Sequence, residues 1–196
     1  LKTTLCVHVT DSRLPADELI GHFQTDDIYA HCFHGTGNAI LKESGEVFPA
    51  IKEAKARGVI FDCSNGVAHF DFTVARNAME QGFNPDIIST DLTLRNSLRT
   101  DKVFSLLFIM SKYLNMGMSF FDVVRSVPRT PARLMKMEGQ IGTLAPGAFA
   151  DIAIVKLRKE KIVFEDTKGT QLEGDRYIDN CATISNGQIV YRRQRF

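Results

Sequence analysis

Short and almost uninterrupted apolar runs recur along the first part of the chain. They are TTLCVHV at residues 3–9, DIYAHCF at 27–33, GVIFDCS at 58–64 and DIISTD at 86–91. Because apolar and polar residues do not alternate cleanly in them, each run is typical of a strand covered on both faces, as in a parallel sheet. We therefore expect these runs to form one parallel sheet.

Helical patterns separate the runs. PADELIGHF begins with a proline, EVFPAIKEAKARG carries apolar residues at helical spacing up to Gly58, and DFTVARNAMEQG stops at Gly82. After the last run come DKVFSLLFIMSKYLNMG, SFFDVVRSV and TPARLMKM, which are also helical patterns. Alternating strands and helices predict an α/β fold, either an open doubly wound sheet or half of an eight-stranded barrel.

The pattern changes beyond Gly142. TLAPGAFADIAIVKL predicts a turn and a strand, and KIVFE, CATISNG and QIVYRR predict further short strands. Asn186 and Gly187 predict a tight hairpin between the last two strands, and the polar stretch at 166–179 predicts a loop. We expect two parts, a β/α region at residues 1–141 and a small β segment at residues 142–196.

The overall charge is close to neutral. Lysine and arginine number 24 against 23 for aspartate and glutamate, which gives a net charge of +1. Such a chain has no field that attracts nucleic acid or an anionic membrane. The longest apolar stretch, VFSLLFIM, is far shorter than the ~20 residues that cross a bilayer. We expect neither nucleic acid nor a membrane as a partner.

The spacing of the cysteines and glycines bears on disulfide bonding and on nucleotide binding. Cys6, Cys32, Cys63 and Cys181 form no C-x-x-C pair, which favours free thiols in a reducing cytoplasm over disulfides. No G-x-G-x-x-G or G-x-x-x-x-G-K-[ST] motif follows any run. We expect a cytoplasmic protein that does not bind nucleotide phosphates through such a loop.

Metal-competent side chains stand at the ends of the expected strands. The first ends at His8, the second at His31, the third near Asn65 and the fourth at Asp91. Carboxyl ends of parallel strands meet at one edge, where two imidazoles and a carboxylate suit a divalent ion. Alternatively, each histidine is a packing residue bonded to backbone, and Asp91 caps the following turn. Three such groups at three strand ends favour the metal site.

The same segments resemble a known family. VHVTDS, AHCFHG, ISTDLTLRN and above all TPARLMKMEGQIGTLAPGAFADIAIV look like the latter half of the amidohydrolase superfamily, on the deacetylase or dihydroorotase-like branch. The resemblance implies the C-terminal half of a (β/α)8 barrel, strands five to eight, over residues 1–141. It implies a small β-sandwich segment over residues 142–196.

The resemblance also implies a metal site and a reaction. In that superfamily the histidines that end strands five and six bind one metal ion, and the aspartate that ends strand eight binds another and moves protons. By motif these roles fall to His8, His31 and the catalytic Asp91. We expect one or two divalent ions, zinc first, although manganese, iron and cobalt suit the same ligands. The implied reaction is hydrolysis of a small-molecule amide or ester by metal-activated water.

Substrate contacts are expected from the loops after the last two strands. Where related deacetylases carry a G-H-G-like motif, this chain reads CSNGVAHF, with Asn65 in the histidine's place and His69 further on. Arg95 and Asn96 follow Asp91 and could bind a substrate carboxylate, although a surface salt bridge explains Arg95 equally well. His34 could touch the substrate or a residue that supports the metal ligands, but we expect it to lie exposed in a loop.

The paired strand-one histidines and the bridging lysine of the superfamily have no match in the sequence. A half barrel would expose two sheet edges. We therefore expect a longer parent protein, a separate N-terminal half or a homo-oligomer. Two hypotheses follow: a metal-dependent amidohydrolase of which this chain holds part of the site and is inactive alone, or a non-catalytic fragment or interaction module that keeps the fold.

Overall fold

A short parallel sheet forms the N-terminal part of the structure. The computed structural model describes residues 3–94, 96–98 and 102–194. The sheet has the order β1 (Cys6–His8), β2 (Ile28–Ala30) and β3 (Ile60–Asp62). Its register pairs His8 with Ala30 and Ala30 with Asp62, so the carboxyl ends of all three strands lie at one edge. The predicted α/β class is confirmed.

The fourth apolar run follows β3 without forming a regular strand. One parallel bridge joins Asp62 to Ile87, and the Cys63 amide donates to the Ile87 carbonyl at 3.0 Å. Side chains replace part of the ladder, because the Phe61 amide donates to the Asp86 carboxylate at 2.9 Å. The prediction of a regular strand at 86–91 is therefore wrong. The segment still runs beside β3, and it brings Asp91 to the same edge of the sheet.

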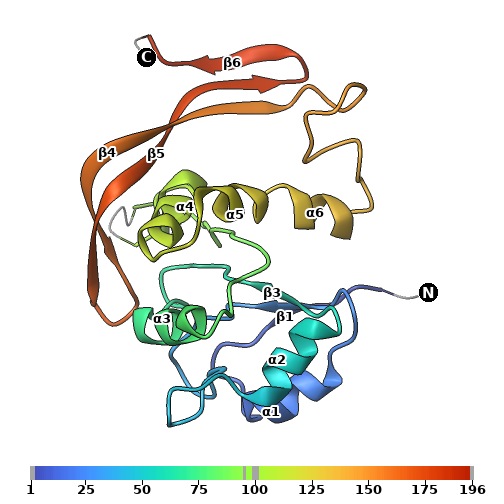
Figure 1. Ribbon diagram of the computed structural model, residues 1–196, viewed down its shortest axis with the longest axis vertical. Helices are drawn as coiled ribbons and strands as arrows, with labels where there is room; N and C mark the ends of the chain where they lie inside the picture. The colour runs from blue at the N-terminus through green and yellow to red at the C-terminus, as the bar shows by residue number, and fades with distance from the viewer. Residues whose placement is uncertain (1–2, 95, 99–101, 195–196) are drawn as a thin grey trace.

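Helices cover the sheet in two groups (Figure 1). The elements between the strands are α1 (Ala16–Leu19) with the 3-10 turn η1 (Ile20–His22), α2 (Pro49–Ala56) and α3 (Phe72–Glu80). After the 3-10 turn η2 (Asn96–Leu98) come α4 (Leu106–Asn115), α5 (Phe120–Arg125) and α6 (Arg129–Leu134). Side-chain caps define three of the starts: Asp71 for α3, Ser105 for α4 and Ser119 for α5.

A second, antiparallel sheet forms the C-terminal part, with the order β4 (Ile152–Glu165), β5 (Gln171–Ser185) and β6 (Gln188–Arg192). The hairpin predicted at Asn186 and Gly187 is confirmed, and both residues have the positive φ that such turns require, 49° and 75°. The loop predicted at 166–179 is wrong, because β5 occupies most of it. Its polar residues belong to a long strand whose first part, residues 171–175, alternates between exposed and half-buried positions.

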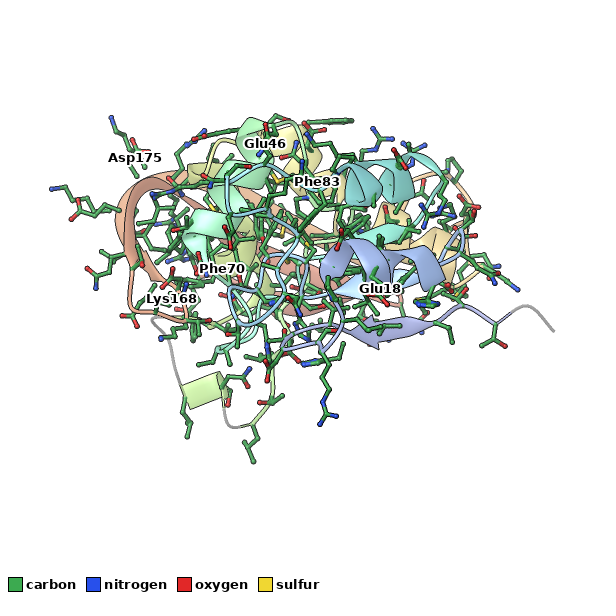
Figure 2. All side chains as sticks on the ribbon, turned by 90° about the horizontal axis from the view of Figure 1, so that it is seen from below. Glu18, Glu46, Phe70, Phe83, Lys168 and Asp175 are labelled. Carbon is green, nitrogen blue, oxygen red and sulfur yellow. The ribbon has the colours of Figure 1, made fainter. Side chains whose placement is uncertain are left out.

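The described residues form one antiparallel layer here, so the expected β-sandwich segment is a single sheet. The β4–β5 hairpin bends around α4, and its tip at 166–170 reaches the start of α3 (Figure 2, where Lys168 and Phe70 are labelled). At the tip, the Phe72 amide donates to the Asp166 carboxylate at 3.1 Å. The C-terminal sheet is thus tied to the loop that precedes α3.

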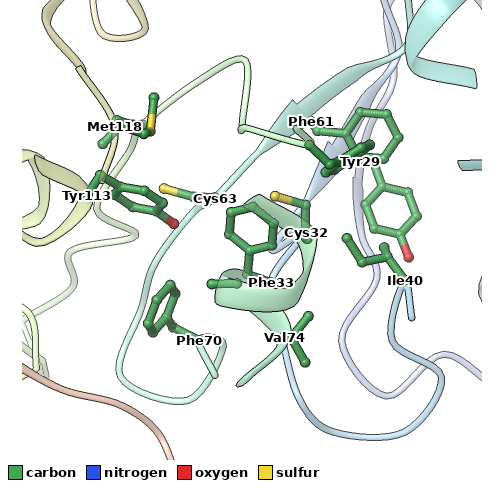
Figure 3. Close-up of a cluster of buried hydrophobic side chains, with 14 of the residues drawn as sticks. Tyr29, Cys32, Phe33, Ile40, Phe61, Cys63, Phe70, Val74, Tyr113 and Met118 are labelled. Carbon is green, nitrogen blue, oxygen red and sulfur yellow. The ribbon is translucent and has the colours of Figure 1, made fainter. Parts of the chain in front are cut away.

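Large apolar side chains fill one continuous core (Figure 3). Tyr29, Phe33 and Tyr113 are fully buried in it, and Phe164 and Ile178 of the antiparallel sheet belong to the same cluster. The two parts expected at 1–141 and 142–196 therefore share a core, and their division into separate units stays a prediction. None of the described helices is long and apolar enough to cross a membrane. The four cysteines are free thiols.

Candidate metal centre

The residues that end the parallel strands adopt an uncommon backbone conformation. His31 follows β2 with φ 63°, Ser64 follows β3 with φ 35°, and Asp91 ends the fourth run with φ 48°. Left-handed conformations cost energy for residues other than glycine and are concentrated at functional sites. Three of them, two after strands β2 and β3 and one at the end of the fourth run, mark this edge as the candidate site.

Three imidazoles converge at this edge. The ring centroids lie 4.5 Å apart for His8 and His31, 5.1 Å for His8 and His69, and 4.2 Å for His31 and His69. One nitrogen of each ring lies within 4.8 Å of the others. His31 is buried, His69 half-buried and His8 exposed, so the cluster opens toward solvent on the His8 side. Such a group can hold a divalent ion.

His31 is oriented by the backbone. Its Nδ1 donates to the Ser64 carbonyl at 2.7 Å, which fixes the tautomer and leaves Nε2 free to bind a metal. Burial lowers the pKa of His31 below 6.5, and the His8 ring adds to this, against the Ser64 bond and the charges of Asp91 and Asp62. Burial also lowers the pKa of His69. Both rings therefore favour the neutral form that metals require.

His69 has an unsatisfied polar atom. Its Nδ1 is buried and finds no hydrogen-bond partner among the described residues. A buried nitrogen without a partner costs about 1–3 kcal/mol, which a bound cation would offset. The structure thus places His69, predicted as a substrate contact, in the same group as the predicted ligands His8 and His31. The three imidazoles fit zinc or a similar ion.

Asp91 lies beside the imidazoles. A Cβ built on Gly66 would come within 2.7 Å of the Asp91 Oδ2 and 2.8 Å of the His69 Cδ2, so both side chains border the same glycine. Burial lowers the pKa of both His31 and His69, and the nearby Asp91 charge acts against this shift. The carboxylate is exposed and available to a water molecule or a ligand.

A pocket of about 510 Å³ opens next to Asp91 and His69. Its other lining residues are Val67, Ala68, Thr93, Asn96 and Leu98. Most of the exposed surface of the wall is apolar, although four of the seven lining residues carry polar groups, and this mixture is typical of small-molecule sites.

The other predicted substrate residues are placed differently. Arg95 lies outside the described residues. Asn96 lines the pocket, but its amide bonds within its own loop, to the Thr93 amide at 2.9 Å and to the Asp91 carbonyl at 2.8 Å. Asn65 is 1% exposed and bonds to the Gly66 carbonyl and to Lys112. Substrate binding by either asparagine stays a prediction.

Two further residues lie near the site: His34 differs from its prediction, and Lys112 was not predicted. His34 is fully buried rather than exposed, and its Nδ1 donates to the Thr36 carbonyl at 2.8 Å. Lys112 is fully buried under Asn65, and the sequence signal for it is a lysine inside the apolar run VFSLLFIMSKYL. Neither residue stands at a strand end, where reactive groups of β/α folds are expected.

Comparison with known proteins agrees with this picture. The profile of the Amidohydrolase family matches residues 6–190. A deacetylase of Enterococcus faecalis is 30% identical over 186 residues, which cover 94% of this chain and 50% of the relative. An adenine deaminase structure superposes with a TM-score of 0.90 at 30% identity, covering 97% of this chain and 51% of the other.

A dihydroorotase structure superposes with a TM-score of 0.83 at 27% identity, covering 97% of this chain and 50% of the other. The chain spans about half the length of these relatives. The family profile matches nearly the whole chain, and the resemblance noted in the sequence is confirmed. The chain belongs to the amidohydrolase family.

Proposed function

We propose that this chain carries part of the site of a metal-dependent hydrolase that cleaves amide or ester bonds of small molecules, in the manner of a deacetylase or dihydroorotase. The convergence of three imidazoles beside a carboxylate and a pocket is the observation that carries the proposal. The family membership supports it, and so do the names of the relatives, which are a deacetylase, a dihydroorotase and an adenine deaminase.

His8 and His31 would hold the ion. Asp91 would lie beside the ion, and the His69 ring would be directed toward it. When bound, a divalent ion supplies an activated water near neutral pH and polarises the scissile carbonyl. Zinc suits this donor set best, while manganese, iron and cobalt are also compatible with it. The Ser64 carbonyl keeps His31 in the tautomer that presents Nε2 to the ion.

Asp91 would act as general base and then as general acid. Its exposed carboxylate lines the pocket, so it can accept a proton from the attacking water and pass it to the leaving group. The apolar side chains of Val67, Ala68 and Leu98 would receive a small acyl or ring group of the substrate.

The remainder of the site would come from outside this chain. We propose that the parallel sheet is the C-terminal half of a (β/α)8 barrel, completed by an N-terminal half or by a second copy of the chain. Support comes from the coverage of about half of each relative. We also propose the cytoplasm as its compartment, which the free thiols favour.

Metal analysis of the purified chain, followed by a hydrolysis screen of acetyl esters and N-acyl amino acids, tests the proposal. We expect zinc, manganese, iron or cobalt to co-purify or to bind at micromolar concentration, and hydrolysis to require the completing half. If no such metal binds the chain, the proposal fails and the non-catalytic hypothesis takes its place.

A further inference from the structure

A lysine is fully buried beneath the loop that carries His69. Lys112 lies on α4 and has 0% exposure, and its Nζ donates to the Asn65 Oδ1 at 3.3 Å. Removing an ammonium group from water costs several kcal/mol, so a methionine or leucine would fill this core position at lower cost. Buried ionisable groups next to a site are candidates for a functional role.

The lysine contacts the segment on both sides of His69. Asn65 precedes the histidine, and the rings of Phe70 and Phe72 follow it with centroids 4.4 Å and 5.6 Å from the Lys112 Nζ. An ammonium group over a ring face is attracted by the ring electrons, most strongly when water is excluded. Figure 3 shows Phe70 facing the α4 residue Tyr113, so this segment packs directly on the helix.

Asn65 transmits the contact to the site. Its Nδ2 donates to the Gly66 carbonyl at 3.0 Å, and its backbone amide donates to the Ser89 carbonyl at 3.1 Å. Gly66 is the residue against which both His69 and Asp91 lie. A displacement of Asn65 would therefore move the backbone that supports His69.

We propose that Lys112 is a positioning residue, whose amine holds the segment from Asn65 to Phe70 so that His69 faces His8 and His31. It acts through Asn65 and touches no substrate. This inference rests on the proposed function, because the segment carries His69, which belongs to the proposed metal site.

The charge state of Lys112 does not break this contact. Burial lowers the pKa of Lys112 to about 7, with Cys63 and Asp166 acting against the shift and Lys102 adding to it. Near neutral pH both the amine and the ammonium forms are present, and both carry hydrogens that can be donated to Asn65.

Histidine ring signals in NMR spectra of selectively labelled protein test the proposal without metal. Lys112→Met keeps an unbranched side chain that is one heavy atom shorter and removes the donor. Lys102→Met is the matched control, because Lys102 is also buried but pairs with Glu165 at 3.0 Å. We expect the His69 signals to shift in Lys112→Met and to stay unchanged in Lys102→Met. Unchanged His69 signals in a folded Lys112→Met variant would overturn the proposal.

Asn65 offers a second test, which also serves if Lys112→Met does not fold. Asn65→Ala removes the acceptor for Lys112 together with the donor to the Gly66 carbonyl, and it should shift the His69 signals. The His69 signals of the double variant Lys112→Met/Asn65→Ala should shift no further than those of the single variants, because both changes remove the same contact. Fully additive shifts, or an unmoved His69 in Asn65→Ala, contradict the proposal.

Cobalt titration separates this inference from the proposed function. If the wild-type chain binds Co²⁺, we expect Lys112→Met to weaken binding about tenfold, as is usual when a residue behind a metal ligand is lost. If the wild-type chain binds no Co²⁺, the proposal of a metal site is contradicted. The His69 signals then still decide the role of Lys112.

Discussion

At the scale of single residues, the site depends on three histidines, two of which, His31 and His69, have a pKa lowered by burial. His8 and His31 could be predicted, because parallel strands bring their carboxyl ends to one edge. The place of His69 could not, because left-handed residues at Ser64 and Gly66 turn the loop back toward the site. Such a turn leaves no periodic signal in the sequence.

Burial of His34 makes the stability of the fold depend on pH. Burial lowers the pKa of His34 from 6.5 to about 4; the bond to the Thr36 carbonyl acts against the shift, and the three histidines of the site add to it. Because the unfolded chain binds the proton first, His34 stabilises the fold above pH 6.5 and this contribution is lost as the pH falls toward 4. We expect a loss of about 3 kcal/mol over that window.

Urea unfolding of the wild type and of His34→Asn at several pH values measures this dependence. Asparagine keeps a donor for the Thr36 carbonyl and does not titrate. The stability of the wild type relative to the variant should decrease between pH 6.5 and about 4. A difference that is the same at all pH values would show that His34 is not the group responsible.

Gly66 offers a direct test of the proximity of His69 and Asp91. Alanine there would place its Cβ 2.7 Å from the Asp91 Oδ2, at a φ of 52°. We expect Gly66→Ala to displace the carboxylate or the His69 ring and to lower zinc affinity at least tenfold. Gly82→Ala controls for backbone strain, since Gly82 has φ 78° with nothing within 4 Å of its Cβ. Equal zinc affinities in the two variants would rule out the crowding.

At the scale of elements, helices with a clear stop signal could be predicted, and strands with polar faces could not. Gly58 and Gly82 ended the patterns that became α2 and α3, and both have positive φ. The polar residues of β5 have a composition typical of a loop, because this strand packs one face on α4 and exposes the other. Tertiary packing, rather than local composition, decides such a strand.

The start of α3 joins the loop that carries His69 to the C-terminal sheet. Asp71 accepts from the Thr73 amide at 2.8 Å and the Val74 amide at 3.1 Å, and it pairs with Lys168 at 2.7 Å. We expect Asp71→Ala to lower the free energy of unfolding by about 1–2 kcal/mol, because the helix loses its cap.

Denaturant unfolding measures this loss, and Lys168→Met is the control. Lys168 is 63% exposed, so its ion pair should contribute about 1 kcal/mol or less. If Lys168→Met destabilises the chain as much as Asp71→Ala, the ion pair and not the cap is the source of the stability.

At the scale of the whole molecule, one core joins two sheets of different kind, with α4–α6 between them (Figure 1). The order of strands and helices predicted the α/β region and the later β part. It did not predict that Phe164 and Ile178 would complete the core of the first part. That contact depends on the bend of the β4–β5 hairpin, which no local pattern specifies.

The metal site is the central claim, and calorimetric titration of the chain with Zn²⁺ tests it most directly. Wild type, His31→Ala and His22→Ala are compared; His22 is an exposed histidine of η1 and serves as the control. We expect micromolar or tighter binding in the wild type and in His22→Ala, and its loss in His31→Ala, with an unchanged helical circular dichroism spectrum in all three. Zinc affinity unaffected by His31→Ala would contradict the account.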